Sequence, residues 1–172
     1  CVDQIGKQYA FVVIDCEAGL EHLSRRTAGD VDLLVVLSDL CARLGLVIPE
    51  LEPETLKRLQ EISPAFIRMR NPVDIWAAAT VKGVEFGYRE GMEAVLKDSN
   101  IDAVVPILML TRETGIPSFE FIVELREKFP EKPILVTFSA EKQYMEECKA
   151  FLEPRGVPTF PEIEQPFEVL SI

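Results

Sequence analysis

The sequence predicts a three-layer α/β fold in which helices cover both faces of an open, mainly parallel β-sheet. Short apolar, β-branched runs alternate with longer stretches of helical period, which is the pattern of successive βα units. The length of 172 residues corresponds to about one domain. With 48% hydrophobic and 27% charged residues, the composition is that of a globular chain and excludes disorder throughout.

Five apolar runs are expected to form strands that are buried on both faces. They are Phe11–Asp15, Leu33–Leu37, Ala103–Leu108, Ile134–Phe138 and Val157–Phe160. Pro106 lies within the third run, and proline usually marks an edge strand or a bulge because it cannot donate a ladder hydrogen bond. Ligands of open parallel sheets bind beyond the carboxyl ends of the strands, so a site is expected there.

Helical stretches fall between and after these strands. Pro53–Ile62 carries a start signal, since Pro53 suits a first helical turn and Leu51 can pack on Leu56 across it. From Val81 to Leu96 the apolar residues recur at helical spacing and predict one amphipathic helix. Further helices are expected at Pro117–Phe129, Ala140–Leu152 and Pro161–Leu170, the last of them weakened by Pro166.

Charge and hydropathy exclude several classes of protein. The net charge of −11 leaves no basic face for nucleic acid. The longest apolar run, 103–110, is shorter than the roughly 20 residues of a membrane span, and the first ten residues do not resemble a signal peptide. We therefore expect a cytoplasmic protein without nucleic-acid or membrane partners. Because the sequence begins with Cys1 rather than Met, a fragment of a longer chain is one interpretation.

The residues that could carry nucleophilic or metal chemistry are few. Cys1, Cys16, Cys41 and Cys148 form no CxxC pair, which favours reduced thiols, and a single histidine, His22, does not complete a metal site. No metal is expected, and the catalytic residues, if any, stay unknown. Other polar groups have ordinary structural readings: Arg25 and Arg26 as a solvated helix face, Glu146 and Glu147 as solubilising charge, and Trp76 as packing.

Residues 11–19, Phe-Val-Val-Ile-Asp-Cys-Glu-Ala-Gly, form a strand with an acidic end followed by a glycine turn. Together with the residues up to 39, this segment resembles the deviant-Walker ATPases, in particular the nickel-insertion accessory proteins of carbon monoxide dehydrogenase. The resemblance implies a relic of the nucleotide switch at Asp15, Glu17 and Gly19. However, no lysine-bearing glycine loop occurs in the chain, so the phosphate cradle is missing. Two core strands with a connecting helix are the plainer interpretation.

Residues 39–172 carry a second and longer resemblance. Its pieces, in order, are Asp39-Leu-Cys-Ala-Arg-Leu-Gly, Glu54-Thr-Leu-Lys-Arg-Leu, Asn71-Pro-Val-Asp-Ile, Asn100-Ile-Asp-Ala-Val-Val-Pro, Lys132-Pro-Ile-Leu-Val and Gly156-Val-Pro-Thr-Phe. This succession is similar to the CoA-ligase domain of ADP-forming acyl-CoA synthetases, relatives of succinyl-CoA synthetase. The resemblance implies a flavodoxin-like, Rossmann-like sheet. The glycine-rich loop that precedes residue 39 in that family is absent here.

The family's reaction converts acyl-CoA, ADP and phosphate to acid, CoA and ATP, and its full enzyme uses CoA and ADP or ATP with magnesium. Its phosphohistidine, CoA-binding and ATP-grasp parts are not encoded in this sequence. The resemblance therefore implies a domain or subunit that is incomplete as an enzyme, binds none of these ligands tightly alone, and has the CoA-binding and ATP-grasp domains as partners. The alternatives are a metallochaperone-type accessory protein, from the ATPase segment, and a non-catalytic interaction module.

The predicted division is an ATPase-like fragment at residues 1–38, packed on the main sheet, and a CoA-ligase-like domain at residues 39–172. Within the second part, Asn71, Pro72 and Asp74 are the candidate ligand-binding residues. Proline at 72 forces an extended or turn conformation on Asn71, and the Asp74 carboxylate can accept backbone amides in a turn. The resemblance implies instead that this loop contacts CoA or a swinging phosphohistidine segment, and the sequence leaves both readings open.

Overall fold

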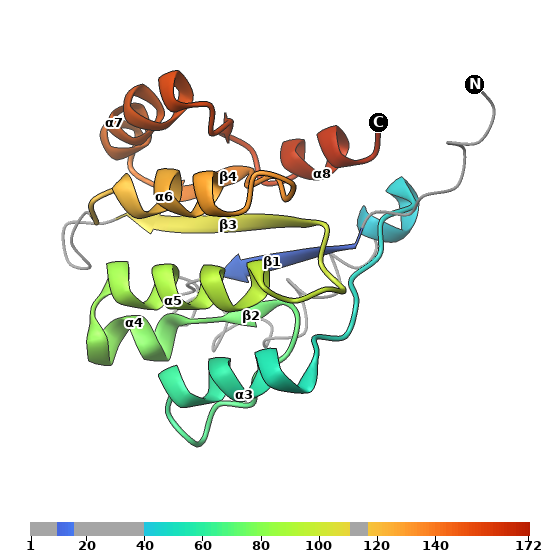
Figure 1. Cartoon of the computed structure of the whole chain (residues 1–172). Coiled ribbons are helices and arrows are strands. Elements are labelled where there is room, and N and C mark those ends of the chain that lie inside the picture. Colours follow the sequence, from blue (N-terminus) through green and yellow to red (C-terminus); the bar gives the residue numbers. More distant parts are fainter. Residues whose placement is uncertain (1–9, 16–39, 111–116) are drawn as a thin grey trace, which may run out of the picture.

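The computed structural model describes residues 10–15, 40–110 and 117–172 and shows a parallel sheet between two layers of helices (Figure 1). The named elements, in chain order, are β1 (Phe11–Asp15), α3 (Pro53–Ile62), β2 (Val73–Asp74), α4 (Trp76–Lys82), α5 (Val84–Leu96), β3 (Ala103–Leu110), α6 (Glu120–Lys128), β4 (Val136–Ala140), α7 (Lys142–Leu152), β5 (Thr159–Phe160) and α8 (Gln165–Leu170). None of the helices among these residues is long and apolar enough to cross a membrane.

The strands follow the order β2-β1-β3-β4-β5, and each neighbouring pair is parallel. This is the strand order of flavodoxin-like folds, in which the chain reverses its winding direction between β1 and β3. The predicted fold class is therefore confirmed. The expected strand Leu33–Leu37 lies outside the described residues.

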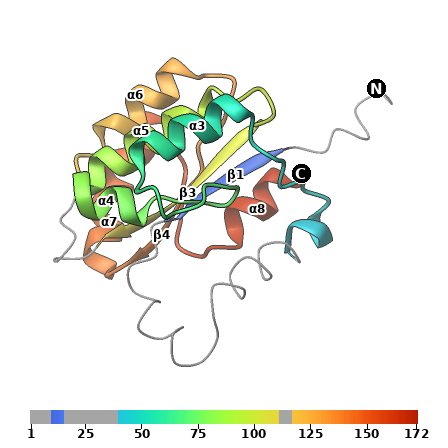
Figure 2. The ribbon, with the colours of Figure 1, turned by 90° about the horizontal axis from the view of Figure 1, so that it is seen from below.

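Strand β3 divides the hydrophobic core in two, because successive side chains of a strand point to opposite faces. Val104 and Leu108 belong to the larger cluster, which gathers side chains of α3, α4, α5, α6 and α7. Ala103, Val105 and Ile107 belong to the smaller cluster, with α8 and the helical turn at 40–44. Figure 2 shows α8 across the sheet from α3, α5 and α6. All eight residues of β3 are buried, as a strand covered on both faces requires.

The position of Pro106 contradicts the expectation that this proline marks an edge strand or a bulge, because β3 is the central strand of the sheet. The pairing of β3 with β4 consists of a bridge at Val104↔Ile134 and a ladder that begins at Ile107↔Thr137. In both places the paired residues are the same number of positions apart in the sequence, so the register continues without a bulge. The ladder simply lacks pairing around the residue that has no N–H to donate.

Two local predictions differ from the structure for identifiable reasons. The single helix expected at Val81–Leu96 is two helices separated by Gly83, whose φ of 99° is unfavourable for other residues. The stripe from Tyr88 to Leu96 is buried as predicted, but Val81 belongs to α4 and is 72% exposed. Strand β2 was not predicted because its two residues lie within the Asn-Pro-Val-Asp segment, which was interpreted as a turn.

At the amino-terminal edge of the sheet, the buried carboxylate of Asp98 fixes the segment that leads into α3. Asp98 Oδ2 accepts the Glu52 N–H at 2.8 Å, and Oδ1 accepts the Asn100 N–H at 2.9 Å. Lys132 Nζ donates to the Asp98 carbonyl at 2.6 Å. Because a buried carboxylate needs such donors, these contacts determine how residues 50–52 sit against the start of β3.

Candidate functional site

The carboxyl-terminal edge of the sheet brings two of the predicted site residues together. Asp15 is the last residue of β1, Asp74 is the last residue of β2, and the register pairs them directly. Neighbouring strands lie about 4.8 Å apart, so the two backbone positions are adjacent. Glu17 and Gly19, the other members of the proposed switch relic, lie outside the described residues. The pairing of Asp15 with Asp74 could not be foreseen, because β2 was not predicted.

The exposed side chain of Asp74 forms the turn that the sequence suggests. Its Oδ1 accepts the N–H of Trp76, the first residue of α4, at 2.8 Å. An aspartate that accepts the amide two residues ahead forms an Asx turn, and here that turn leads from β2 into α4. This geometry accounts for an aspartate at position 74 in structural terms. A contact between Asp74 and a ligand stays a prediction.

Asn71 and Pro72 lie at the opposite end of β2 from Asp74. The peptide bond between them is cis, and Asn71 Nδ2 donates to the Pro49 carbonyl at 3.2 Å. The motif therefore spans the strand instead of forming one loop, which corrects the expectation of a single loop near a strand end. Asn71 and Pro72 form a bend before β2, whereas Asp74 is its last residue.

Tyr88 is a residue of this region that sequence reasoning assigned only to the core. The pairing of β1 with β3 ends at Ile14↔Pro106. Just beyond it, the buried Tyr88 hydroxyl donates to the Ile107 carbonyl at 2.5 Å and accepts the Met109 N–H at 3.1 Å. In a parallel ladder, one residue of a neighbouring strand would bond both of these groups. The hydroxyl therefore takes the place of a strand residue.

The side of β3 that Tyr88 occupies is the side that faces β1. Ala103 N–H donates to the Ala10 carbonyl next to β1, whereas Val104 N–H donates to the Pro133 carbonyl next to β4. Ile107 and Met109 share the orientation of Ala103, because the direction of backbone groups alternates along a strand. Among the described residues, Tyr88 thus lies just beyond the last pair of β1 with β3, at the switch point where flavodoxin-like sheets bind their ligands. This carboxyl-terminal edge of the sheet is the candidate functional site.

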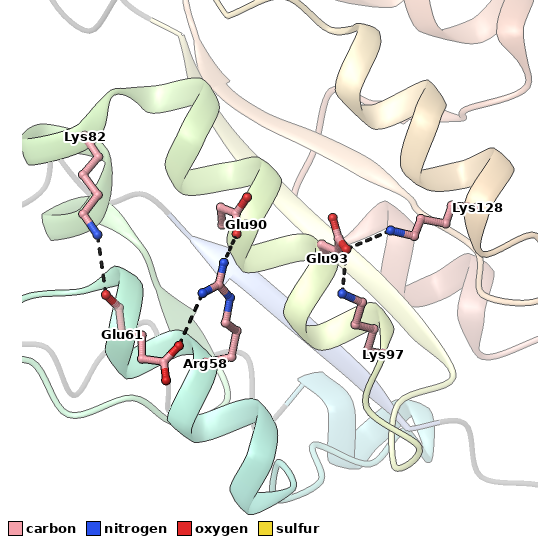
Figure 3. A network of polar contacts seen from close by, with 7 residues as sticks. All are labelled: Arg58, Glu61, Lys82, Glu90, Glu93, Lys97 and Lys128. Carbon is pink, nitrogen blue, oxygen red and sulfur yellow. Dashed lines mark hydrogen bonds and ion pairs between the residues drawn. The ribbon is translucent and has the colours of Figure 1, made fainter.

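A network of charged groups on the helical face is structural (Figure 3). Glu93 of α5 pairs with Lys97 at 2.6 Å and with Lys128 of α6 at 2.8 Å, and these ammonium groups lower the pKa of Glu93 to about 2. Arg58 of α3 pairs with Glu61 at 3.3 Å and with Glu90 of α5. The network joins three helices, and each of its exposed pairs is worth about 0 to 1 kcal/mol.

The described cysteines are unsuited to nucleophilic catalysis. Burial raises the pKa of the Cys41 thiol to about 11 and that of Cys148 to about 12. Since the thiolate is the nucleophile, neither thiol is reactive near neutral pH. In the part of the chain that the structure describes, no group of three or more His, Cys, Asp or Glu residues is arranged to hold a metal. Cys1, Cys16, His22, Arg25 and Arg26 lie outside that part.

The remaining candidates take ordinary positions. Trp76 is half-buried and packs against the larger core cluster, and Glu146 and Glu147 are exposed on α7. The strand order defines a flavodoxin-like α/β domain. Its candidate site lies at the switch point, where the paired ends of β1 and β2 carry Asp15 and Asp74.

Comparison with known proteins gives the relatives of this domain. It is 30% identical over 141 residues to the alpha subunit of the ADP-forming acetate–CoA ligase II of Pyrococcus furiosus, which covers 80% of this chain and 29% of that subunit. It is 26% identical over 134 residues to the ADP-forming acetate–CoA ligase II of Archaeoglobus fulgidus, covering 78% of this chain and 20% of that protein. No protein-family model matches the chain. The chain is thus homologous to one segment of ADP-forming acetate–CoA ligases, less than a third of their length.

A shorter match and two solved structures complete the comparison. The chain is 57% identical over 42 residues to an uncharacterized ATP-binding protein of Methanocaldococcus jannaschii, covering 24% of this chain and 17% of that protein. A protein of Pyrococcus horikoshii has a TM-score of 0.70 at 24% identity, covering 96% of this chain and 35% of its own. The dinucleotide-forming acetyl-coenzyme A synthetase 1 of Ca. Korarchaeum cryptofilum has a TM-score of 0.68 at 19% identity, covering 97% and 32%. These structures share the fold.

Proposed function

We propose that this chain is a domain or subunit of an ADP-forming acyl-CoA synthetase and that it is catalytically incomplete alone. The observation that carries the proposal is the 30% identity to the Pyrococcus furiosus alpha subunit over 80% of this chain. The flavodoxin-like strand order and the match to 97% of this chain in an acetyl-coenzyme A synthetase structure support it. The reaction would be the conversion of acyl-CoA, ADP and phosphate to acid, CoA and ATP.

In this proposal the domain contributes the carboxyl edge of its sheet to a site shared with other domains. Asp74 would face the partner segment or CoA from the end of β2, held by its bond to the Trp76 amide. Tyr88 would position β3 at this edge through its hydroxyl. CoA, and ADP with phosphate, would bind mainly to CoA-binding and ATP-grasp partners. A synthetase structure among the solved relatives holds phosphate and ADP.

A chimera tests this proposal directly. The segment of the Pyrococcus furiosus alpha subunit that matches this chain is replaced by the corresponding part of the chain, and ADP- and phosphate-dependent release of CoA from acetyl-CoA is measured. We expect the chimera to retain activity and its Asp74→Asn form to lose part of it. A chimera that assembles with its partner subunit but is inactive would count against the proposal.

A second function is favoured by one observation, the 57% identity to an ATP-binding protein over 42 residues. Under this alternative the chain would be a nucleotide-dependent accessory protein related to the deviant-Walker ATPases, with Asp15, Glu17 and Gly19 as its switch residues. Calorimetric titration with magnesium-ATP and with CoA separates the two functions. We expect no magnesium-dependent nucleotide binding and at most weak CoA binding; tight, magnesium-dependent ATP binding would establish the alternative.

A third outcome of the same experiments is an interaction module. A chain that binds neither CoA nor magnesium-ATP, yet co-purifies with the other parts of the synthetase, would contribute only to assembly. The chimera then distinguishes a structural contribution from a catalytic one, because an Asp74→Asn substitution would leave a purely structural domain as active as before.

A further inference from the structure

A cleft of about 780 Å³ lies beside the amino-terminal end of β2, away from the carboxyl edge where the candidate site is found. Its walls are the segment 48–51, which leads into α3, the segment 68–71, which leads into β2, and Leu56 of α3. Ligand pockets commonly measure about 300 to 1,000 Å³, so this cleft is large enough for a molecule the size of a nucleotide. The proposed function makes no use of it.

Hydrogen bonds hold the two walls in place. Asn71 Nδ2 donates to the Pro49 carbonyl at 3.2 Å and thereby links one wall to the other. Asn100 Nδ2 donates to the Glu50 carbonyl at 3.2 Å, and the buried Asp98 carboxylate accepts the Glu52 N–H. The backbone around the cleft is therefore fixed by side chains from other parts of the fold. A preformed wall of this kind lowers the entropic cost of binding.

Two arginines project from one of these walls. Arg68 and Arg70 are both exposed, whereas Met69 between them is 7% exposed and belongs to the core. Both arginines line the cleft, one on each side of this buried residue. Glu50 is the acidic residue of the lining, which leaves two guanidiniums against one carboxylate.

These two arginines differ from the others of the described chain. Arg58, Arg89, Arg126 and Arg155 each contact a carboxylate or a carbonyl oxygen. Within the described residues, Arg68 and Arg70 have no ion pair and no hydrogen bond. This is unexpected in a chain with 29 acidic and 18 basic residues, where carboxylate partners are abundant. Guanidiniums without such partners in the described residues retain their capacity to bind an anion, because their donors are matched in geometry to phosphate.

We propose that the cleft between 48–51 and 68–71 is a binding site for an organic phosphate, with Arg68 and Arg70 bound to a diphosphate group. The apolar side chains of Ile48, Leu51 and Leu56 would contact the organic part of the ligand. Binding needs no magnesium, since the guanidiniums neutralise the phosphate charge. The site is distinct from the candidate site at the carboxyl edge of the sheet and does not depend on the proposed function.

Calorimetric titration of the full 172-residue chain with ADP in the presence of EDTA tests the proposal. We expect saturable binding that inorganic pyrophosphate displaces and that adenosine, which lacks phosphate, does not. The double variant Arg68→Gln/Arg70→Gln should weaken binding at least about tenfold, because each arginine contributes charge-assisted hydrogen bonds. Both side chains are exposed, so this variant should unfold at the wild-type temperature.

The control variant Lys57→Gln/Lys142→Gln removes two exposed charges that do not line the cleft, and it should bind ADP as the wild type does. Amide chemical-shift changes on adding ADP should fall in 48–51 and 68–71. The proposal is overturned if millimolar ADP gives no saturable binding, if the control loses as much affinity as the arginine variant, or if the shift changes gather at the carboxyl ends of β1 and β2.

Discussion

Substituting Tyr88 by phenylalanine tests whether the tyrosine hydroxyl takes the place of a strand residue beside β3. The change keeps the ring, which is fully buried, and removes only the hydroxyl that bonds Ile107 and Met109. A buried polar group that loses its partner costs about 1 to 3 kcal/mol, so two such groups place the loss at about 2 to 6 kcal/mol. For a chain of this size, each kcal/mol lowers the melting temperature by about 2 to 4 °C.

The assay is urea unfolding followed by far-ultraviolet circular dichroism, with amide hydrogen exchange of Met109 as the local measurement. Tyr88→Phe should lower the free energy of unfolding by this amount and accelerate exchange at Met109. Thr80→Val is the control, because the Thr80 hydroxyl bonds the Ala77 carbonyl at the exposed surface and its loss should cost about 0.5 kcal/mol or less. If Tyr88→Phe is as mild as this control, the hydroxyl does not replace a strand residue.

Three further predictions follow from other described groups. Because Lys128 and Lys97 lower the Glu93 pKa to about 2 from 4.5, its stabilising contribution is complete above pH 4.5 and is lost as the pH falls toward 2. Glu93→Gln should therefore cost about 1 kcal/mol at pH 7 and make unfolding less acid-dependent over that range. Asp98→Asn should lower the free energy of unfolding in urea by about 2 to 4 kcal/mol, because one of the two backbone N–H groups that the carboxylate accepts would then face an amide NH₂. A smaller loss than that caused by the exposed substitution Asp102→Asn would contradict this prediction. Cys41 and Cys148 should resist a thiol reagent at pH 8 until the chain unfolds, as measured by mass spectrometry of their peptides, and rapid native labelling would show that they are accessible.

Much of the fold could be predicted from sequence, because its strongest signals are local. The run at Phe11–Asp15 and the helix at Pro53–Ile62 were predicted with the bounds that the structure shows. Each has a sharp chemical boundary: an aspartate that ends an apolar run, and a proline suited to a first helical turn. Elsewhere the ends moved by a few residues, as in β4, which begins at Val136 instead of Ile134.

The candidate site was less predictable, because it depends on which segments become neighbours. Asp15 and Asp74 are 59 positions apart and adjoin only because β2 pairs with β1. A two-residue strand has no apolar periodicity of its own, so this pairing could not be predicted from the sequence. The Tyr88 hydroxyl was likewise hidden, since a tyrosine in an apolar helical stripe predicts burial but not the backbone groups that it bonds.

Strand β1 has a consequence for how the polypeptide can be divided. It comes from the part of the chain that resembles one family, yet it lies between β2 and β3, which belong to the part that resembles another. Among the described strands, β2 pairs only with β1. Cutting the chain at residue 38 would therefore remove β1, detach β2 from the sheet and leave the backbone of β3 unpaired on that side. A boundary between two sequence resemblances thus need not be a boundary between two folding units, and we expect neither part to fold compactly after such a cut.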